Sequence, residues 1–328
     1  MDTLSAFESA LVRLGGTLLS RRGRAASLLV LIYHRVTTVA DPMMPSEPDA
    51  HRFAAQMDLL ADNFSVLPLR EGVRRLCEGT LPARAVCITF DDGYANNFTV
   101  AMPILHARGL TATVFVAPAF LNGGRMFNDT VYEAIRQAPP QLDLRAHGLD
   151  QYSLSDAPSR INAAQSIILK LKHLPAAERR GQAQALAEHV GARLPADLMM
   201  TDDQVARMAA SGIEIGAHTM THPILATLDE ATARAEINQS KERLQEITGA
   251  PVHSFAYPNG KPGQDYRHEH VLLARAAGFE LAVSTSWGAA TAAADPWQIP
   301  RVAPWDQRAF RYAARLVNAY RERHFRVA

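Results

Sequence analysis

The fold of this chain is decided by the stretch Ala85-Val86-Cys87-Ile88-Thr89-Phe90-Asp91-Asp92-Gly93, an apolar run that ends in two carboxylates and a glycine. Such a run is typical of a buried strand, and Asp-Asp-Gly is also common in turns. Two like charges at the end of an apolar strand cost free energy through repulsion and desolvation unless a cation or a proton relieves them. The stretch therefore indicates either a polar site or an acidic turn, and partners elsewhere in the chain must decide.

The composition is that of an ordinary globular protein. The chain has 328 residues, of which 48% are apolar and 20% are charged, and its formal net charge is +1. This length suits a barrel-like α/β fold in one unit. The charge balance excludes a polyelectrolyte signal, so nucleic acid is not an expected partner. The two cysteines, Cys77 and Cys87, indicate neither a disulfide framework nor a metal pair.

Residues 1–27 are expected to form an amphipathic N-terminal helix, because leucine and phenylalanine recur at helical spacing over residues 3–20. The apolar run that follows is too short for a signal peptide, and acidic residues precede it, so we expect a cytoplasmic location. Docking of this helix on its own domain is the first interpretation. Peripheral contact with a membrane surface, helped by Arg21, Arg22 and Arg24, is the alternative.

From residue 28 onward, short β-rich runs alternate with longer helical patterns, which predicts βα units around parallel strands. We expect strands at 28–33, 65–68, 85–90, 111–116, 213–217, 253–256 and 281–284. We expect helices between them at 49–62, 70–78, 96–108, 201–211, 229–248, 267–277 and 306–323. In such folds reactive residues gather at the carboxyl ends of the strands.

One stretch, about 117–212, departs from this alternation. It contains no convincing strand, and helical patterns occur near 127–137, 158–172 and 176–190. We therefore expect a helical insertion within one domain that spans residues 28–328. An insertion at the carboxyl end of a strand would overhang the site and shape substrate choice. A helical cover without ligand contact is the alternative.

A second signal is the segment His-Thr-Met-Thr-His-Pro at 218–223. His218 and His222 lie on one face if the residues between them form a single helical turn. A histidine pair alone is also common at structural or surface positions. Together with Asp91 and Asp92, however, the pair offers two imidazoles and one carboxylate. This set leaves coordination positions open for water and substrate, as hydrolytic zinc sites require.

The Thr-Phe-Asp-Asp-Gly and His-Thr-x-x-His segments resemble those of the polysaccharide deacetylase family, carbohydrate esterase family 4. The resemblance covers roughly residues 28–305 and is weakest in the insertion. It implies an α/β fold, a distorted, incomplete (β/α) barrel. It also implies Asp91 as the general base and Asp92, His218 and His222 as ligands of a divalent metal. Zinc is the first candidate, and nickel, cobalt or iron are alternatives.

Further residues are assigned by the same resemblance. Tyr257, Pro258 and Asn259 lie in a segment similar to the family motif whose tyrosine backbone N–H helps to bind the oxyanion. Many members carry an arginine in this motif, and here Arg301 is expected to replace it, with a structural ion pair as the alternative. The usual Leu-x-His motif is absent. His34 resembles the acid histidine of biofilm poly-N-acetylglucosamine deacetylases, and a buried hydrogen-bonded histidine is the alternative.

Two other sets of residues have open assignments. Trp287, Trp297 and Trp305 follow the last expected strand. Their rings suit the apolar faces of sugars, although core packing is the commoner fate of tryptophan. Asn128 and Asp129 open the insertion, where they either reach sugar hydroxyls or cap the following helix, and we favour the cap.

These residues predict metal-dependent removal of N-acetyl groups from an N-acetylated oligo- or polysaccharide, such as an exopolysaccharide or a surface glycan. Removal of a formyl or O-linked acetyl group from a lipid-linked sugar or small glycan is the nearest alternative. A catalytically silent glycan-binding protein is disfavoured, because both carboxylates and both histidines are present. A zinc peptidase is disfavoured because the histidine pair lacks the glutamate of His-Glu-x-x-His.

Overall fold

A parallel sheet forms the centre of the computed structural model, which describes residues 3–328. Its strand order is β1–β3–β4–β7–β8–β9, and β2 (Ser65–Val66) pairs with the amino end of β3. The six strands on the main path are β1 (Leu29–Tyr33), β3 (Ala85–Phe90), β4 (Thr113–Val116), β7 (Glu214–Ala217), β8 (Ser254–Ala256) and β9 (Leu281–Val283). Each strand lies within two residues of its predicted range. β3 is buried along its whole length, which explains its continuous apolar run.

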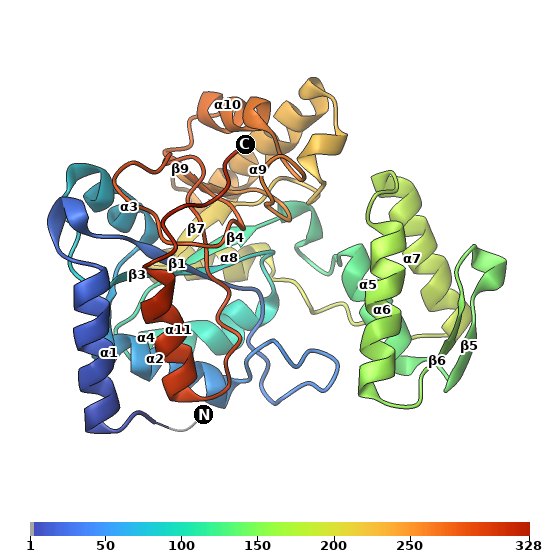
Figure 1. Ribbon diagram of the computed structural model, residues 1–328. Helices are drawn as coiled ribbons and strands as arrows, with labels where there is room; N and C mark the ends of the chain where they lie inside the picture. Colours follow the sequence, from blue (N-terminus) through green and yellow to red (C-terminus); the bar gives the residue numbers. More distant parts are fainter. Residues whose placement is uncertain (1–2) are drawn as a thin grey trace.

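Helices between the strands form an outer layer around this sheet (Figure 1). They are α2 (Ala50–Asn63), α3 (Leu69–Glu78), α4 (Met102–His106), α8 (Asp202–Ala210), α9 (Glu230–Thr248), α10 (His268–Ala276) and α11 (Ala309–Ala319). The helix expected at 96–108 is irregular, because a π-helical segment (Asn97–Ala101) precedes α4. α11 begins three residues later and ends four residues earlier than predicted, and the remaining helices of this layer begin and end within one residue of their predicted ranges.

The sheet curls into a barrel that is not closed by a regular strand. Residues 299–302 lie between β9 and β1 and make isolated bridges, Val283 to Ile299 and Leu31 to Val302. This arrangement confirms the predicted class, an α/β fold with a distorted, incomplete (β/α) barrel. The bridging segment also carries Arg301 into the ring of strands, where it is buried.

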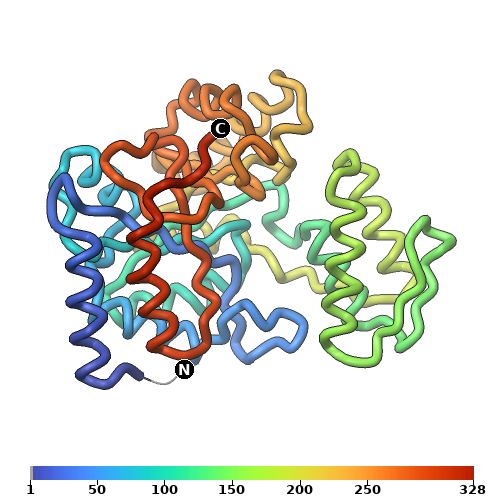
Figure 2. The backbone as a smooth tube through the Cα atoms, in the orientation of Figure 1, coloured from blue at the N-terminus to red at the C-terminus, as the bar shows by residue number. Residues whose placement is uncertain are grey.

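The insertion stands beside the barrel as a lobe with its own apolar core (Figures 1 and 2). It contains α5 (Phe127–Gln137), α6 (Ala157–Leu171) and α7 (Ala176–Val190), as predicted. It also contains a hairpin of β5 (Gln141–Asp143) and β6 (Gln151–Ser153), which the sequence did not indicate. Strands of three residues are too short to show the alternation of apolar and polar residues on which the prediction depends.

The N-terminal helix α1 (Ala6–Leu19) packs against α11 through its small residues. Val12 and Gly16 are buried, and a Cβ atom at Gly15 would lie 3.2 Å from Val317. The leucine stripe that was expected to dock instead faces solvent. Its exposed members are Phe7 (72%), Leu11 (44%), Leu14 (60%) and Leu18 (59%).

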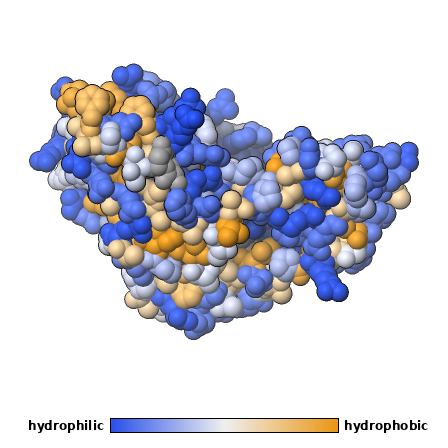
Figure 3. All heavy atoms as spheres, turned by 90° about the horizontal axis from the view of Figure 1, so that it is seen from below, coloured by the Kyte–Doolittle hydropathy of each residue, from blue (hydrophilic) through white to orange (hydrophobic). Residues whose placement is uncertain are grey.

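Hydrophobic surface is visible on the side of the molecule that α1 occupies (Figure 3). None of the helices in residues 3–328 combines the length and the apolar character of a membrane-spanning helix. The separation of residues 1–27 from a domain of residues 28–328 stays a prediction.

Candidate active site

The Asp-Asp-Gly turn points both carboxylates into one cavity. Asp91 follows the last residue of β3, and Asp92 and Gly93 adopt left-handed backbone conformations with φ of 77° and 89°. A Cβ atom at position 93 would approach Val116 Cγ1 to 2.9 Å, so the turn favours glycine there. Because the turn reverses the strand's alternation, Asp91 and Asp92 both line the same cavity.

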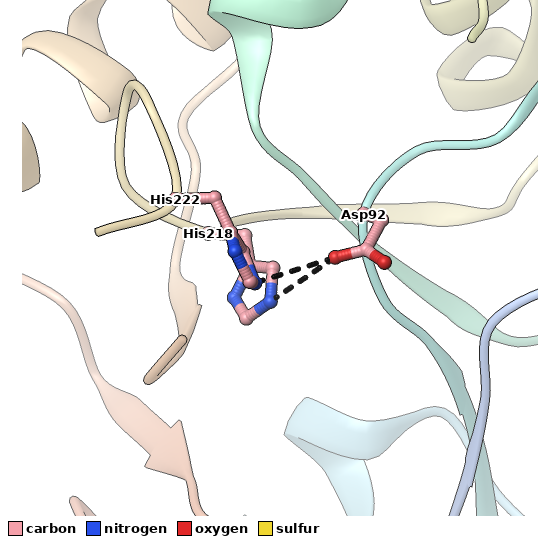
Figure 4. Close-up of side chains that lie close together, drawn as sticks. All are labelled: Asp92, His218 and His222. Atoms are coloured by element: carbon pink, nitrogen blue, oxygen red, sulfur yellow. Dashed lines mark ion pairs between the residues drawn. The ribbon is translucent and has the colours of Figure 1, made fainter. Parts of the chain in front are cut away.

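His218 and His222 meet Asp92 at the carboxyl end of β7 (Figure 4). The Nε2 atoms of His218 and His222 lie 3.6 and 3.5 Å from Asp92 Oδ1. The segment between the histidines is not a helical turn, because Thr219 and His222 have left-handed φ values of 60° and 53°. The loop nevertheless brings the two rings together, with centroids 4.7 Å apart.

This cluster has the donors that a divalent metal needs. His218 Nδ1 lies 2.7 Å from the Ala256 carbonyl oxygen, so Nδ1 carries the proton and Nε2 presents a lone pair. Asp92 Oδ1 is buried and has no hydrogen-bond partner among residues 3–328. Burial lowers the pKa of His218 and His222 to about 4, although the charge of Asp91 opposes this shift. Neutral imidazoles and an unpartnered carboxylate oxygen fit a metal site.

Asp91 is held by a buried arginine. Arg301 Nη1 and Nη2 donate to Asp91 Oδ1 and Oδ2, each at 2.7 Å, and Arg301 Nε donates to the Ser284 carbonyl at 2.9 Å. Burial raises the pKa of the Asp91 carboxyl. The charges of Arg301 and His218 outweigh burial and hold that pKa well below its usual range. Asp91 is therefore ionised, and its orientation is fixed by a bidentate pair.

His34 lies at the carboxyl end of β1, half-buried, and lines the same cavity as Asp91 and His222. Its backbone carbonyl accepts a hydrogen bond from Asn97 Nδ2 at 2.9 Å. The structure thus brings His34 to the same cavity as the carboxylates and the histidine pair.

The structure does not support Tyr257 as the oxyanion donor. Its backbone N–H already donates to the Val283 carbonyl at 3.2 Å, and its ring stacks on Tyr266 inside the core. Asn259, two residues later, lines the cavity with a left-handed φ of 59°, whereas Tyr257 and Pro258 do not line it. Among residues 3–328 the Asn259 N–H has no acceptor. The reason is that β8 continues its pairing with β9 through Tyr257, and only the turn after it faces the site.

Arg35, Tyr94 and Asp129 form a buried polar group beside the site, of which the sequence pattern indicated Asp129 alone. Arg35 forms an ion pair with Asp129, its guanidinium lies 3.7 Å from the centroid of the Tyr94 ring, and Tyr94 Oη donates to Asp129 at 3.1 Å. Burial and the charge of Asp92 raise the pKa of Asp129 to about 6, against the charge of Arg35. Asp129 does not cap α5, contrary to the interpretation that the sequence favoured. The N-cap residue is Met126, which makes no side-chain hydrogen bond. This group instead ties the insertion to the barrel.

The cavity has a volume of about 640 Å³ and lies between the barrel and the insertion. The insertion contributes Asn128, Tyr132, Ile161 and Gln165 to its wall, and residues 43–47 close another side. The insertion therefore borders the carboxyl ends of the strands, which is the position from which it can affect substrate choice.

A second cavity of about 310 Å³ adjoins the first and shares His34 and Thr285 with it. Trp287 and Trp305 line this second cavity, with ring centroids 5.3 Å apart and partly exposed faces. Trp297 packs against the core instead. Two of the three tryptophans thus lie beside the site, and one has the structural role that was the alternative.

The family is shown by a family model described as polysaccharide deacetylase, which matches residues 78–168 and 178–282, more than half of the chain. The chain belongs to the polysaccharide deacetylase family. The Bacillus subtilis (strain 168) protein YxkH, whose name assigns it provisionally to this family, is 22% identical over 270 residues, 82% of this chain and 68% of that protein.

Solved structures share the fold. The Streptococcus pyogenes deacetylase PplD, in complex with acetate, aligns with a TM-score of 0.59 and 19% identity over 89% of this chain and 98% of that one. IcaB from Ammonifex degensii aligns with a TM-score of 0.58 and 19% identity over 91% and 99% of the two chains. Because these chains align over almost their whole length, they share the barrel fold described here.

Arg301 supports a first prediction. In Arg301→Gln, Asp91 remains buried without its charged partner, so we expect the free energy of unfolding at pH 7 to fall by about 3–5 kcal/mol. The pKa of Asp91 is lower in the folded than in the unfolded protein, so its ionised carboxylate stabilises the folded protein at pH values above the unfolded pKa. This contribution is lost as the pH falls through the folded pKa. The difference between the two proteins should therefore shrink below about pH 4.

Urea unfolding of both proteins at pH 7 and below pH 4 measures this difference. The matched control is Arg74→Gln, which removes an exposed pair with Glu78 and should cost under about 1 kcal/mol. A loss in Arg301→Gln as small as that of the control would show that the buried pair is not a source of stability.

Proposed function

We propose that this chain is a metal-dependent hydrolase that removes N-acetyl groups from the amino sugars of a glycan. One observation carries the proposal: an ionised Asp91, held by Arg301, lies beside the Asp92, His218 and His222 cluster in a single cavity. The Asp91 carboxylate is engaged by an arginine, whereas Asp92 Oδ1 has no hydrogen-bond partner among the described residues. The two neighbours therefore have separate roles, proton acceptor and metal ligand.

Asp92, His218 and His222 would hold the metal, with zinc as the first candidate and nickel, cobalt or iron as alternatives. When bound, such an ion polarises a carbonyl and lowers the pKa of water. Asp91 accepts the proton of the water that adds to the acetyl carbon, and Arg301 keeps Asp91 ionised and oriented. When the carbon–nitrogen bond breaks, the amine takes a proton from His34. Acetate and a free amino sugar leave.

The negative charge on the carbonyl oxygen needs a donor from the protein. The Asn259 N–H is the backbone donor suited to this role, because Asn259 lines the cavity and its N–H has no acceptor among residues 3–328. Its left-handed conformation is fixed by Thr285, whose Oγ1 donates to the Asn259 carbonyl at 2.7 Å. A preorganised donor of this kind stabilises charge in a site from which water is excluded.

His34 supports a second prediction, which separates an acid from a structural histidine. We expect His34→Gln to lower kcat for an N-acetylated sugar by about 10²-fold, because an amine is a poor leaving group without a proton. The rate with p-nitrophenyl acetate should fall much less, since nitrophenolate leaves without protonation. Steady-state kinetics on both substrates measures the contrast, and an equal loss on both would assign His34 a structural role.

The substrate is proposed to be an N-acetylated oligo- or polysaccharide. The main cavity continues into the second cavity, where Trp287 and Trp305 offer ring faces to sugars. Acetate release from a panel of N-acetylglucosamine oligomers, coupled to metal analysis of the purified protein, tests the proposal. No metal and no acetate would overturn it. Mass spectrometry of the product identifies the acyl group that is removed. Loss of a formyl or O-linked acetyl group would replace N-deacetylation by one of these alternative activities.

We also propose that α1 binds peripherally to anionic membrane surfaces. Its apolar stripe faces solvent, and Arg21, Arg22 and Arg24 are exposed at its carboxyl end. This combination is typical of helices that lie in the membrane interface. The cytoplasmic location stays a prediction.

Sedimentation with phosphatidylglycerol vesicles tests this contact. The full chain should bind, and the double variant Leu14→Gln/Leu18→Gln should bind about tenfold more weakly. Leu272→Gln, which changes an exposed leucine on α10, is the matched control and should bind like the unchanged protein. Failure of the unchanged protein to bind would refute the membrane contact.

A further inference from the structure

An arginine of the insertion is buried and, within the part of the chain that the structure describes, has no acidic partner. Arg179 lies in the first turns of α7 and is only 8% exposed. Its Nη1 donates to the Lys172 carbonyl at 3.2 Å and its guanidinium covers the Phe127 ring at 4.5 Å. Among residues 3–328, its buried Nε has no hydrogen-bond partner and its guanidinium takes part in no ion pair. A buried cation without an acidic partner is costly, so this position favours an anionic ligand.

The Arg179 side chain borders a small cavity beside the cluster of Asp92, His218 and His222. The cavity has a volume of about 50 Å³, and Ala176, Arg180 and Thr221 are among its lining residues. His222 and Asn128 line both this cavity and the main one, so the two spaces adjoin at a proposed metal ligand. A volume of this size exceeds what one water molecule requires and suits a compact anionic group.

Two further features make the cavity electropositive. The amino end of α7 opens onto it at Ala176, and the N-cap residue Pro175 offers no side-chain hydrogen bond to the free N–H groups of the first turn. Arg180 adds a second guanidinium. Burial and the charge of Arg180 lower the pKa of Arg179. Helix amino ends and arginine forks are recurrent partners of carboxylate and phosphate groups.

We propose that Arg179 and the amino end of α7 form an anion-binding subsite, which takes a carboxylate or phosphate substituent of the glycan next to the sugar that is deacetylated. This inference rests on the proposed function and specifies its substrate class as an acidic N-acetylated glycan. The subsite selects the substrate through binding. Its loss should therefore raise KM far more than it lowers kcat.

The kinetic test compares two oligosaccharide sets of equal length. One contains N-acetylglucosamine alone, and the other alternates N-acetylglucosamine with glucuronic acid. The unchanged protein should prefer the acidic set by at least about tenfold in kcat/KM, and Arg179→Gln should bring this ratio near one. Arg179→Lys, which keeps the charge without the planar fork, should give an intermediate ratio. Arg193→Gln removes a charge from the insertion outside the cavity and should keep the preference.

A binding measurement keeps this inference separate from the proposed activity. Isothermal titration of the acidic oligosaccharide into Asp91→Asn, with and without Arg179→Gln, should show about tenfold weaker binding in the double variant even if no acetate is released. Acetate release from both sets at equal kcat/KM would overturn the subsite and leave the deacetylase proposal standing. Arg179-dependent binding of inorganic phosphate without any preference among oligosaccharides would also overturn it, because the site would then serve a free anion.

Discussion

Asp91→Asn should lower kcat/KM for acetate release by about 10²–10⁴-fold, the usual contribution of a positioned general base. Asparagine keeps the shape of the side chain and can still accept a hydrogen bond from Arg301, but it cannot take a proton from water. The metal content should stay at the level of the unchanged protein, because the proposed ligands are Asp92, His218 and His222. Initial rates and elemental analysis of the same sample measure both quantities.

The informative control for this variant is its neighbour. Asp92→Asn makes the same chemical change one residue further along the chain and should lose metal as well as activity. Circular dichroism and a thermal melt confirm that each variant is folded, since Asp91→Asn leaves the buried Arg301 without a charged partner. Unchanged turnover in Asp91→Asn would end its assignment as the base, and loss of metal would make both carboxylates ligands.

The second large effect is expected at the histidine pair. His222→Gln should reduce the metal bound after zinc loading and gel filtration from one equivalent per chain to a small fraction, and acetate release should fall at least about 10³-fold. The His222 side chain is 21% exposed, whereas that of His218 is 2% exposed, so glutamine at 222 disturbs packing less. His106→Gln, an exposed histidine on α4, is the matched control.

The same cluster sets the pH range of metal binding. Because the pKa of both histidines is lowered to about 4, they stay neutral well below the usual range of histidine, and the site should load zinc down to about pH 5. Loading should fail as the pH falls through about 4.

Full activity in His222→Gln without bound metal would show that the metal is not required.

The positions of the strands and of four site residues follow from local patterns in the chain. Apolar runs bounded by turn residues locate every strand of the barrel, because a buried parallel strand needs a continuous apolar segment whatever surrounds it. Asp91, Asp92, His218 and His222 were found in the same way, since each follows a strand and the carboxyl ends of parallel strands meet. The hairpin of the insertion escaped because its strands are too short for a pattern.

Only the tertiary structure decided which groups face one another. The ion pair between Arg301 and Asp91 joins positions 210 residues apart, through a bridging segment that no periodicity predicts. The N–H of Tyr257 donates a hydrogen bond to β9, whereas that of Asn259 does not. This difference depends on where β8 and β9 diverge. The cavity beside Arg179 is formed where the insertion meets the barrel, because Phe127 and Arg179 line it from one side and Thr221 and His222 from the other. Local sequence determines the strands and the chemistry at their ends, but the partners of each side chain depend on packing between distant segments.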